Sequence, residues 1–194
     1  MRCGRRLLAS RDRWLWLDVG AVDRTIIEDT RNKVGRHKVK NDWWAAHGVS
    51  VVRRKLDFGD YARTDDYGNV VVDTKQDVQE VAGNVGHDHA RFVRECDRAA
   101  DAGHRLVILV EEHPEYNDRD QLATWVSGVC KRCHKCDPLH SKCRTKRFKP
   151  LNGPTLRKII DKLEYKHGVR FVFCDKRDTG RVICDLLGIE YEKR

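Results

Sequence analysis

Two charged side chains, Asp73 and Lys75, stand at the end of the apolar run VVVDTK, residues 70–75. Because side chains alternate across a β-strand, the two would share one face of the strand and lie close together. Leaving either charge unpaired in a desolvated site costs on the order of several kcal/mol, so the pair needs a partner, a metal ion or an open cleft. We therefore expect this strand to end at a functional surface.

Two further acids occupy comparable positions: Asp29 follows the apolar run TIIE, and Asp60 follows a turn at Gly59. In a mainly parallel sheet, such strand ends converge at one edge. Carboxylates gathered there suit Mg²⁺, which keeps several waters and takes one or two carboxylates together with phosphate oxygens. A metal in this setting generates a hydroxide nucleophile, while a nearby ammonium orients water or stabilises developing charge. Taken singly, each spacing also fits a solvated ion pair.

A second group of residues with a chemical pattern is the segment CKRCHKCDPLHSKC, which supplies Cys130, Cys133, Cys136 and Cys143. Two-residue gaps let backbone turns bring thiolates to one tetrahedral centre, so the spacing predicts a Zn²⁺ site, with His140 as a substitute for one cysteine. An iron–sulfur cluster is the less favoured alternative, because C-x2-C-x2-C also opens a ferredoxin-type run. Free or disulfide-bonded cysteines are the remaining interpretation.

The same segment concentrates the positive charge of the chain. Residues 131–149 hold eight Lys or Arg and one acid, which makes +7 of a total net charge of +9. A charge run is usually a solvated face, but beside a metal-stapled loop it forms a rigid surface for phosphates. We expect DNA as the partner, with substrate contacts from Lys131, Arg132, Lys135 and Arg144.

The elements that must position these residues alternate between strands and helices, which predicts an α/β fold. Residues 1–23 are expected to form an N-terminal extension that can be disordered, residues 24–190 the main domain, and residues 113–152 a basic Cys-rich insertion within it. Expected strands cover 24–29, 49–56, 69–75, 104–112 and 169–174, and expected helices cover 40–48, 78–103, 153–163 and 179–187.

The chain carries no apolar run near the ~18 residues that a membrane helix needs, so no segment is expected to span a bilayer. The basic start resembles a secretion signal, but Arg11, Asp12 and Arg13 interrupt its apolar stretch. We therefore expect a cytoplasmic protein.

The order of the motifs resembles the XPF-family nuclease domain, a branch of the PD-(D/E)XK nuclease superfamily, and especially its short phage and bacterial members. The motifs that carry this resemblance are IIEDTR (26–31), LDFGDY (56–61), VVVDTK (70–75), HARFVREC (89–96), LVILVEE (106–112) and KLEYKHGVRFVFCDKRDTGRVICDLL (162–187). The resemblance implies a restriction-endonuclease-like mixed central sheet flanked by helices. It also implies an endonuclease that uses Mg²⁺ or Mn²⁺ to cut branched or otherwise structured DNA in repair, recombination or replication.

The resemblance further implies roles for individual residues. Asp60 and Asp73 would be the main metal ligands and Lys75 the catalytic lysine. Asp29 would be an additional acid, Arg31 a contact to substrate phosphate, and Arg91 a substrate-binding residue on the helix that closes the site.

The chain also departs from the family pattern, in which E-R-K is followed by three residues and an Asp. Here the run is Asp73-Thr74-Lys75, and Gln79 stands where the last acid would fall, so Asp77 or Glu80 would have to replace it. The alternative is therefore a catalytically silent, zinc-containing DNA-binding module with a nuclease fold. A third interpretation places the chemistry at the cysteines, but the paired histidines of HNH-type nucleases are missing.

The larger relatives carry helicase and helix-hairpin-helix regions, and this sequence contains neither. A homodimer or a partner protein therefore stays open, and no nucleotide cofactor is expected.

Overall fold

The computed structural model describes residues 24–65, 69–112, 114–140, 143–147 and 149–193, and the expected N-terminal extension lies outside them. The elements follow in the order β1 (Thr25–Glu28), α2 (Lys38–Ala46), β2 (Ser50–Arg53), β3 (Tyr61–Arg63), β4 (Val70–Lys75), α3 (Val78–Gly86), α4 (His89–Asp101), β5 (Arg105–Glu112), the 3-10 turns η1 (Pro114–Tyr116) and η2 (Asp120–Thr124), α5 (Gly128–Cys133), α6 (Gly153–His167), β6 (Arg170–Asp175) and α7 (Thr179–Leu187).

One six-stranded sheet has the order β2-β1-β3-β4-β5-β6. β1 and β2 pair in parallel, as do β4, β5 and β6, whereas β3 is antiparallel to both of its neighbours. Because β3 alone runs the opposite way, its first residue lies at the same edge as the last residues of β1 and β4. The expected mixed α/β sheet is thus confirmed, and its topology brings three acid-bearing segments to one edge.

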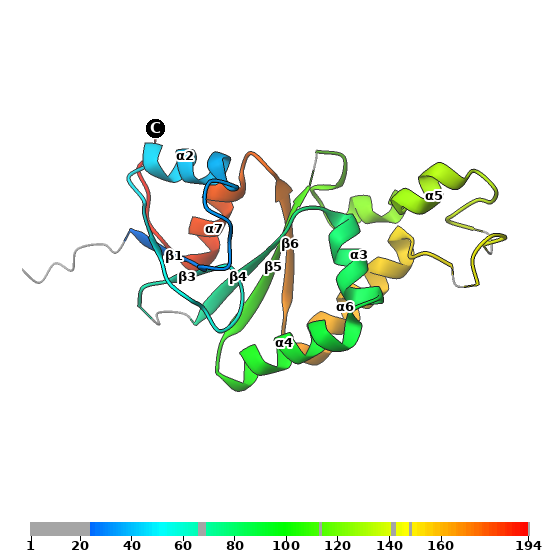
Figure 1. The fold of residues 1–194 in the computed structure, drawn as a ribbon, viewed down its shortest axis with the longest axis horizontal. Helices are drawn as coiled ribbons and strands as arrows, with labels where there is room; N and C mark the ends of the chain where they lie inside the picture. Colours follow the sequence, from blue (N-terminus) through cyan, green and yellow to red (C-terminus); the bar gives the residue numbers. More distant parts are fainter. Residues whose placement is uncertain (1–23, 66–68, 113, 141–142, 148, 194) are drawn as a thin grey trace, which may run out of the picture.

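Helices cover both faces of this sheet (Figure 1). One core lies between the sheet and helices α3, α4 and α6, and a second lies between the sheet and helices α2 and α7. In β4, Val71 belongs to the first core and Val72 to the second. The strand is therefore buried on both faces, which explains why its sequence reads as a continuous apolar run.

The helical pattern expected over residues 78–103 forms two helices instead of one, and this part of the prediction is wrong. The backbone N–H groups of His87 and Asp88 both donate to the carbonyl of Gly83, which ends α3, and α4 begins at His89. Gly83 and Gly86 occupy the last turn of α3, where glycine lowers helix stability by about 1 kcal/mol relative to alanine. The apolar spacing continues across the break, so periodicity alone does not reveal it.

The other expected helices are confirmed. α6 starts with Pro154 in its first turn and with the side chain of Asn152 accepting the N–H of Thr155, and α7 ends at Gly188, whose φ is +65°. No helix in the described ranges combines the length and the apolar character needed to cross a membrane.

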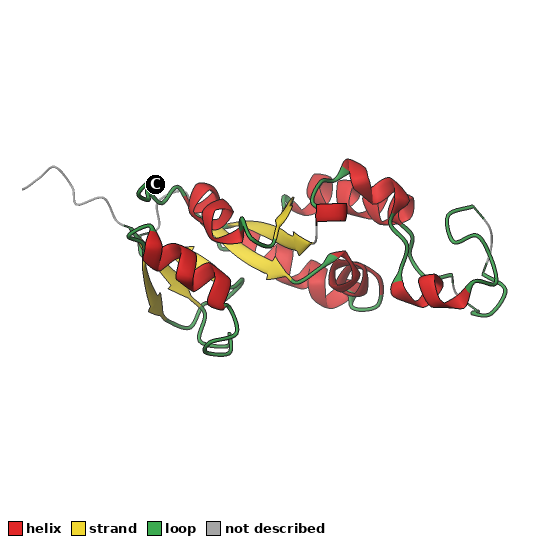
Figure 2. Cartoon of the chain, turned by 90° about the horizontal axis from the view of Figure 1, so that it is seen from above, coloured by secondary structure: helices red, strands yellow, loops and turns green. Residues whose placement is uncertain are grey.

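The predicted insertion begins later than expected. Tyr116, Leu122 and Trp125 are buried in the first core, so the body of the domain extends through them. A bridge pairs Val126 with Asn152 and closes off residues 126–152, which we call the cysteine arm. Seen from above, the arm extends beyond the helices that cover the sheet (Figure 2).

The described part of the arm between residues 128 and 151 contains no buried residue. The chain re-enters the body of the domain at Gly153. Only glycine fits there, because an added Cβ would lie 1.5 Å from the carbonyl oxygen of Leu122. The arm is therefore tightly held where it joins the body and open to solvent beyond that point.

Candidate active site

A cleft of about 570 Å³ opens at the sheet edge where the acids were expected. Its acidic lining consists of Asp60, Asp73, Glu80 and Glu111, which come from the start of β3, the end of β4, α3 and β5. Basic side chains outnumber them: Arg31, Lys33, Arg36, Lys38, Lys40, Lys75 and Lys176 also line the cleft. The arrangement suits a polyanion that approaches a group of carboxylates.

Asp73 and Lys75 form the ion pair that the strand pattern predicts, with Nζ of Lys75 2.5 Å from Oδ2 of Asp73. Asp73 is only 7% exposed, and burial raises its pKa to about 7 against the opposing charge of Lys75. Burial would lower the pKa of Lys75, but the neighbouring Asp73 carboxylate outweighs it and raises that pKa. Lys75 therefore keeps its charge, while Asp73 titrates near neutral pH.

Asp60 is fixed by the turn that precedes it. Its N–H donates to the carbonyl of Val72 at 2.8 Å, and Gly59 has a φ of +68°, a left-handed conformation that favours glycine. A Cβ on Gly59 would also approach the Val71 side chain to 2.5 Å. Thr74 holds the carboxylate itself, since both its N–H and its hydroxyl donate to Oδ2 of Asp60, at 2.9 Å and 2.5 Å.

Asp29 is placed differently from Asp60 and Asp73, because it is fully buried and does not line the cleft. Its two oxygens accept the backbone N–H and the guanidinium of Arg31 and the backbone N–H of Leu56. Burial would raise the pKa of Asp29, but these hydrogen bonds outweigh it and lower the pKa. Asp29 thus fixes Arg31, which does line the cleft and whose Nη2 also donates to the carbonyls of Leu56 and Gly59.

Asp77 and Glu80, the two candidates for the missing acid, differ in their position relative to the cleft. Asp77 caps α3 by accepting the N–H of Glu80 at 2.7 Å, and it does not line the cleft. Glu80 does line the cleft, although one of its oxygens accepts the N–H of Gln76 at 2.8 Å. Of the two, Glu80 is therefore the acid placed to contribute to the site.

Sequence reasoning missed a buried ion pair between Lys40 of α2 and Glu111 of β5. Their exposures are 4% and 6%, and Nζ of Lys40 also lies 5.2 Å from the centre of the Tyr61 ring. Glu111 carried a usable signal, because it ends an apolar strand as Asp73 does. Lys40 carried none, since only the packing of α2 against the sheet brings it to the cleft.

Comparisons with known proteins identify the family of this chain. A family model described as the ERCC4 domain matches residues 28–186. This chain belongs to the ERCC4 domain family. The resemblance inferred from the motifs is thus confirmed, and none of the curated proteins searched matches the chain.

A solved structure described as XPF from Aeropyrum pernix in complex with DNA has a similar fold. It shares 19% identity with this chain at a TM-score of 0.53, and the match covers 84% of this chain. The chain spans 63% of the length of that structure's chain, so it corresponds to part of that protein.

Within this ERCC4 domain, Gln79 has a structural contact of its own. Its side-chain oxygen accepts the backbone N–H of Gly128, the first residue of α5, at 2.9 Å. The position where the family pattern has an acid therefore joins α3 to the cysteine arm.

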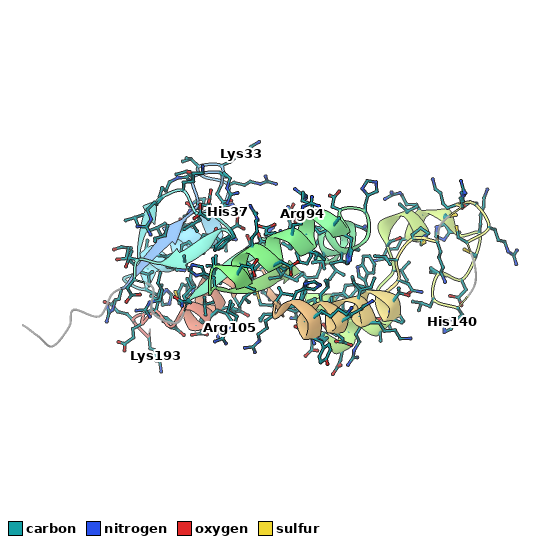
Figure 3. All side chains as sticks on the ribbon, turned by 90° about the horizontal axis from the view of Figure 1, so that it is seen from below. Lys33, His37, Arg94, Arg105, His140 and Lys193 are labelled. Carbon is teal, nitrogen blue, oxygen red and sulfur yellow. The ribbon has the colours of Figure 1, made fainter. Side chains whose placement is uncertain are left out.

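The remaining substrate-binding candidates lie away from the cleft. Arg91 is exposed on α4, 3.4 Å from the Asp88 carboxylate, and does not line the cleft. Lys131, Arg132, Lys135 and Arg144 are exposed on the cysteine arm. Figure 3 shows the separation, with Lys33 and His37 of the cleft toward one end of the molecule and His140 of the arm at the other.

The described cysteines divide into two groups by burial. Cys96, Cys174 and Cys184 are buried. The four cysteines of the arm together line one small cavity, whereas His140 does not line it and instead bonds through Nδ1 to the Asp137 carboxylate at 2.9 Å. Among the described residues, no three His, Cys, Asp or Glu side chains are already grouped closely enough to hold a metal ion.

Proposed function

We propose that this chain is a metal-dependent endonuclease that hydrolyses phosphodiester bonds in branched or otherwise structured DNA. The observation that supports it most strongly is the joint presence of Asp60, Asp73 and Lys75 in one cleft whose lining is otherwise rich in Lys and Arg. The carboxylates suit a divalent cation, and the surrounding positive charge suits the DNA backbone.

Asp60 and Asp73 would hold the metal, Mg²⁺ or Mn²⁺, with Glu80 as a third acid at the cleft. Oδ2 of Asp73 is buried, and no described residue hydrogen-bonds to it with good geometry, although the Lys75 ammonium lies beside it. Both hydrogen bonds that the described residues donate to the Asp60 carboxylate fall on Oδ2, which leaves Oδ1 available to a cation. A bound divalent metal supplies Lewis-acid chemistry and lowers the pKa of water.

The chain's own residues would then orient the substrate and the water. The Lys75 ammonium stays protonated near neutral pH and would stabilise charge that develops on the phosphate oxygens. Arg31, locked by two hydrogen bonds from its guanidinium to Asp29, would hold a neighbouring phosphate. We therefore assign Asp29 a positioning role.

DNA as the substrate is supported by three observations of different kinds. The net charge is +9, basic side chains surround the acids of the cleft, and the similar structure was solved in complex with DNA. The preference for structured DNA rests on membership of the ERCC4 domain family.

The alternative, a silent DNA-binding module, is supported by one specific observation. Gln79 replaces an acid of the family pattern, and its side-chain oxygen is occupied by Gly128. The presence of Asp60, Asp73 and Lys75 in the same cleft argues against it, because a silent fold has no need to keep all three.

The test is cleavage of labelled duplex, flap and four-way-junction DNA with Mg²⁺ by wild type, Asp73→Ala and Lys75→Ala. Arg181→Ala is the control, because Arg181 pairs with Asp185 on α7 and does not line the cleft. We expect cleavage by wild type and the control, and DNA binding without cleavage by both cleft variants. Binding without cleavage by wild type, with Mn²⁺ as well as Mg²⁺, would leave the silent module.

A further inference from the structure

We propose that Cys130, Cys133, Cys136 and Cys143 together bind one Zn²⁺ and that this ion fixes the basic surface of the cysteine arm for contact with a DNA backbone. The metal site stands independently of the cleft chemistry. Its role in DNA contact rests on the proposed function.

The shape of the arm places the four thiols around one cavity. The Ser127 side chain accepts the N–H of Cys130 and caps α5, which carries Cys130 and Cys133 on successive turns. His134 then takes a left-handed conformation with φ of +52°, which reverses the chain toward Cys136. All four cysteines line one cavity with about 10 Å³ of space inside it, and His140 does not. This favours a four-thiolate site over one that includes His140.

Neighbouring polar groups already contact the sulfurs in the way that metal-bound thiolates require. The Thr145 hydroxyl lies 3.6 Å from Sγ of Cys133 and 3.5 Å from Sγ of Cys143, so these two sulfurs share one partner. The N–H of Lys146 donates to Sγ of Cys143 at 3.3 Å. A hydrogen bond donated to a sulfur stabilises the thiolate, which is the form that binds metals.

The arm needs a stabilising metal ion because its described residues lack a hydrophobic core of their own. At its base, Nδ2 of Asn152 donates to the carbonyl of Pro138 at 3.1 Å, and Gln79 of α3 accepts from Gly128. A six-residue helix such as α5 is unstable in isolation. In a structural zinc site, the free energy of metal binding becomes free energy of folding. Zn²⁺ would draw the four thiols from their shared cavity into a closed tetrahedral cage.

The surface that this cage would support carries almost only positive charge. Its described basic residues are all exposed: Lys131, Arg132, Lys135, Arg144, Lys146, Arg147 and Lys149. The one acid among residues 131–149, Asp137, accepts from the backbone N–H of Leu139 and contacts the His140 ring. Side chains fixed in place lose less conformational entropy when they bind phosphate than side chains on a mobile loop.

The metal is tested first, on the full chain purified without added metal. Elemental analysis should find one zinc per chain, and replacement by Co²⁺ should give the strong visible absorption of tetrahedral cobalt thiolate. Cys136→Ser and Cys143→Ser should lose the metal, whereas His140→Ala should keep it. The four-thiolate assignment is overturned by zinc loss in His140→Ala, by iron–sulfur absorption, by disulfides found in the intact mass, or by a metal-free chain.

The DNA contact is tested by the salt dependence of binding, measured without Mg²⁺ so that no cleavage is needed. The double variant Lys135→Ala with Arg144→Ala should bind several-fold more weakly, and its log–log salt slope should fall by about 0.9 for each phosphate that the variant no longer neutralises. The matched control is Lys162→Ala with Lys166→Ala on α6, which removes equal charge from exposed positions outside the arm.

An equal loss of affinity in both double variants would show that only net charge matters and would overturn the arm as a DNA contact. A zinc-loaded arm without cleavage by wild type would refute the nuclease and leave the metal site standing. The two proposals therefore fail separately.

Discussion

The cleft and the cysteine arm concentrate reactive side chains in opposite ways. The cleft collects residues from Arg31 to Lys176, and the sheet and the two cores fix their positions before any ligand arrives. The thiols of the arm lie within fourteen residues of sequence, from Cys130 to Cys143, in a segment that the described structure leaves outside both cores. Long-range packing thus holds the charges of the cleft in place, whereas the arm would depend on the zinc ion that we propose.

This difference predicts where each region is vulnerable. Substitutions in the cleft should change chemistry or global stability, because its charged groups are built into the body of the domain. Substitutions in the arm should change metal content and DNA affinity while the body stays folded. Four sets of variants test the contrast, beginning with the largest expected effect.

Asp60→Asn should reduce the cleavage rate by about 10²–10³-fold, comparable to the loss of one essential charge-stabilising group. The amide keeps the volume of the side chain and can still accept from Thr74, so the fold should persist. Single-turnover cleavage at saturating DNA measures the effect, and zinc content should equal that of wild type. Activity within tenfold of wild type would remove Asp60 from the proposed metal site.

Lys40→Met should destabilise the domain by about 3–5 kcal/mol, because it leaves the buried Glu111 carboxylate without its partner. The double variant Lys40→Met with Glu111→Leu should recover most of this loss, since it removes both charges. Urea unfolding followed by circular dichroism gives the free energies, and Arg144→Ala in the arm should leave them unchanged. A single variant as stable as wild type would mean that the Glu111 carboxylate finds water or another cation.

The prediction for Asp60 rests on residues that the sequence already indicated, whereas the prediction for Lys40 does not. Asp60, Asp73 and Lys75 were predictable because a glycine turn and the alternation of a strand fix their relative directions locally. The pair of Lys40 and Glu111 was not predictable, because 71 residues separate its members and only the packing of α2 on the sheet joins them.

The same reasoning explains why the sequence did not reveal one of the strands and the contacts of one buried acid. β3 has three residues, too few for an alternating pattern to be recognised. The contacts that hold Asp29, such as its bond to the N–H of Leu56, 27 residues away, cannot be inferred from the sequence. For the cysteines, by contrast, spacing alone brought the four thiols to attention, because their meeting requires only local turns.

In metal-free protein, the Asp73 carboxyl should make the fold less stable as the pH rises. Its pKa is raised to about 7 in the folded chain, so between pH ~4 and ~7 the folded state holds more protons than the unfolded state. The free energy of unfolding of wild type, relative to Asp73→Asn, should therefore fall as the pH rises through that window. A pKa shift of this size sets an upper limit of about 4 kcal/mol on that change in the free energy of unfolding.

The contribution of Asp29 to stability depends on pH in the opposite direction. Its pKa is lowered, so it stabilises the fold above the pKa of the unfolded chain, and that contribution is lost as the pH falls. Thermal unfolding in chelator at several pH values, with Asp29→Asn beside Asp73→Asn, separates the two. Parallel curves for wild type and Asp73→Asn would show that burial leaves the Asp73 carboxyl unperturbed.

The smallest expected effect belongs to Gln79, the side chain that joins the two regions. Gln79→Ala removes one hydrogen bond to Gly128, worth about 1 kcal/mol, at a position exposed to solvent. We expect a few-fold loss of DNA affinity with an unchanged cleavage rate at saturating DNA, because the arm loses part of its anchor while the cleft stays intact.

Gln79→Asp separates the two roles that this position can have. If the acid of the family pattern were the missing element, Gln79→Asp would raise the cleavage rate. If the anchor is what matters, it should bind DNA no better than Gln79→Ala.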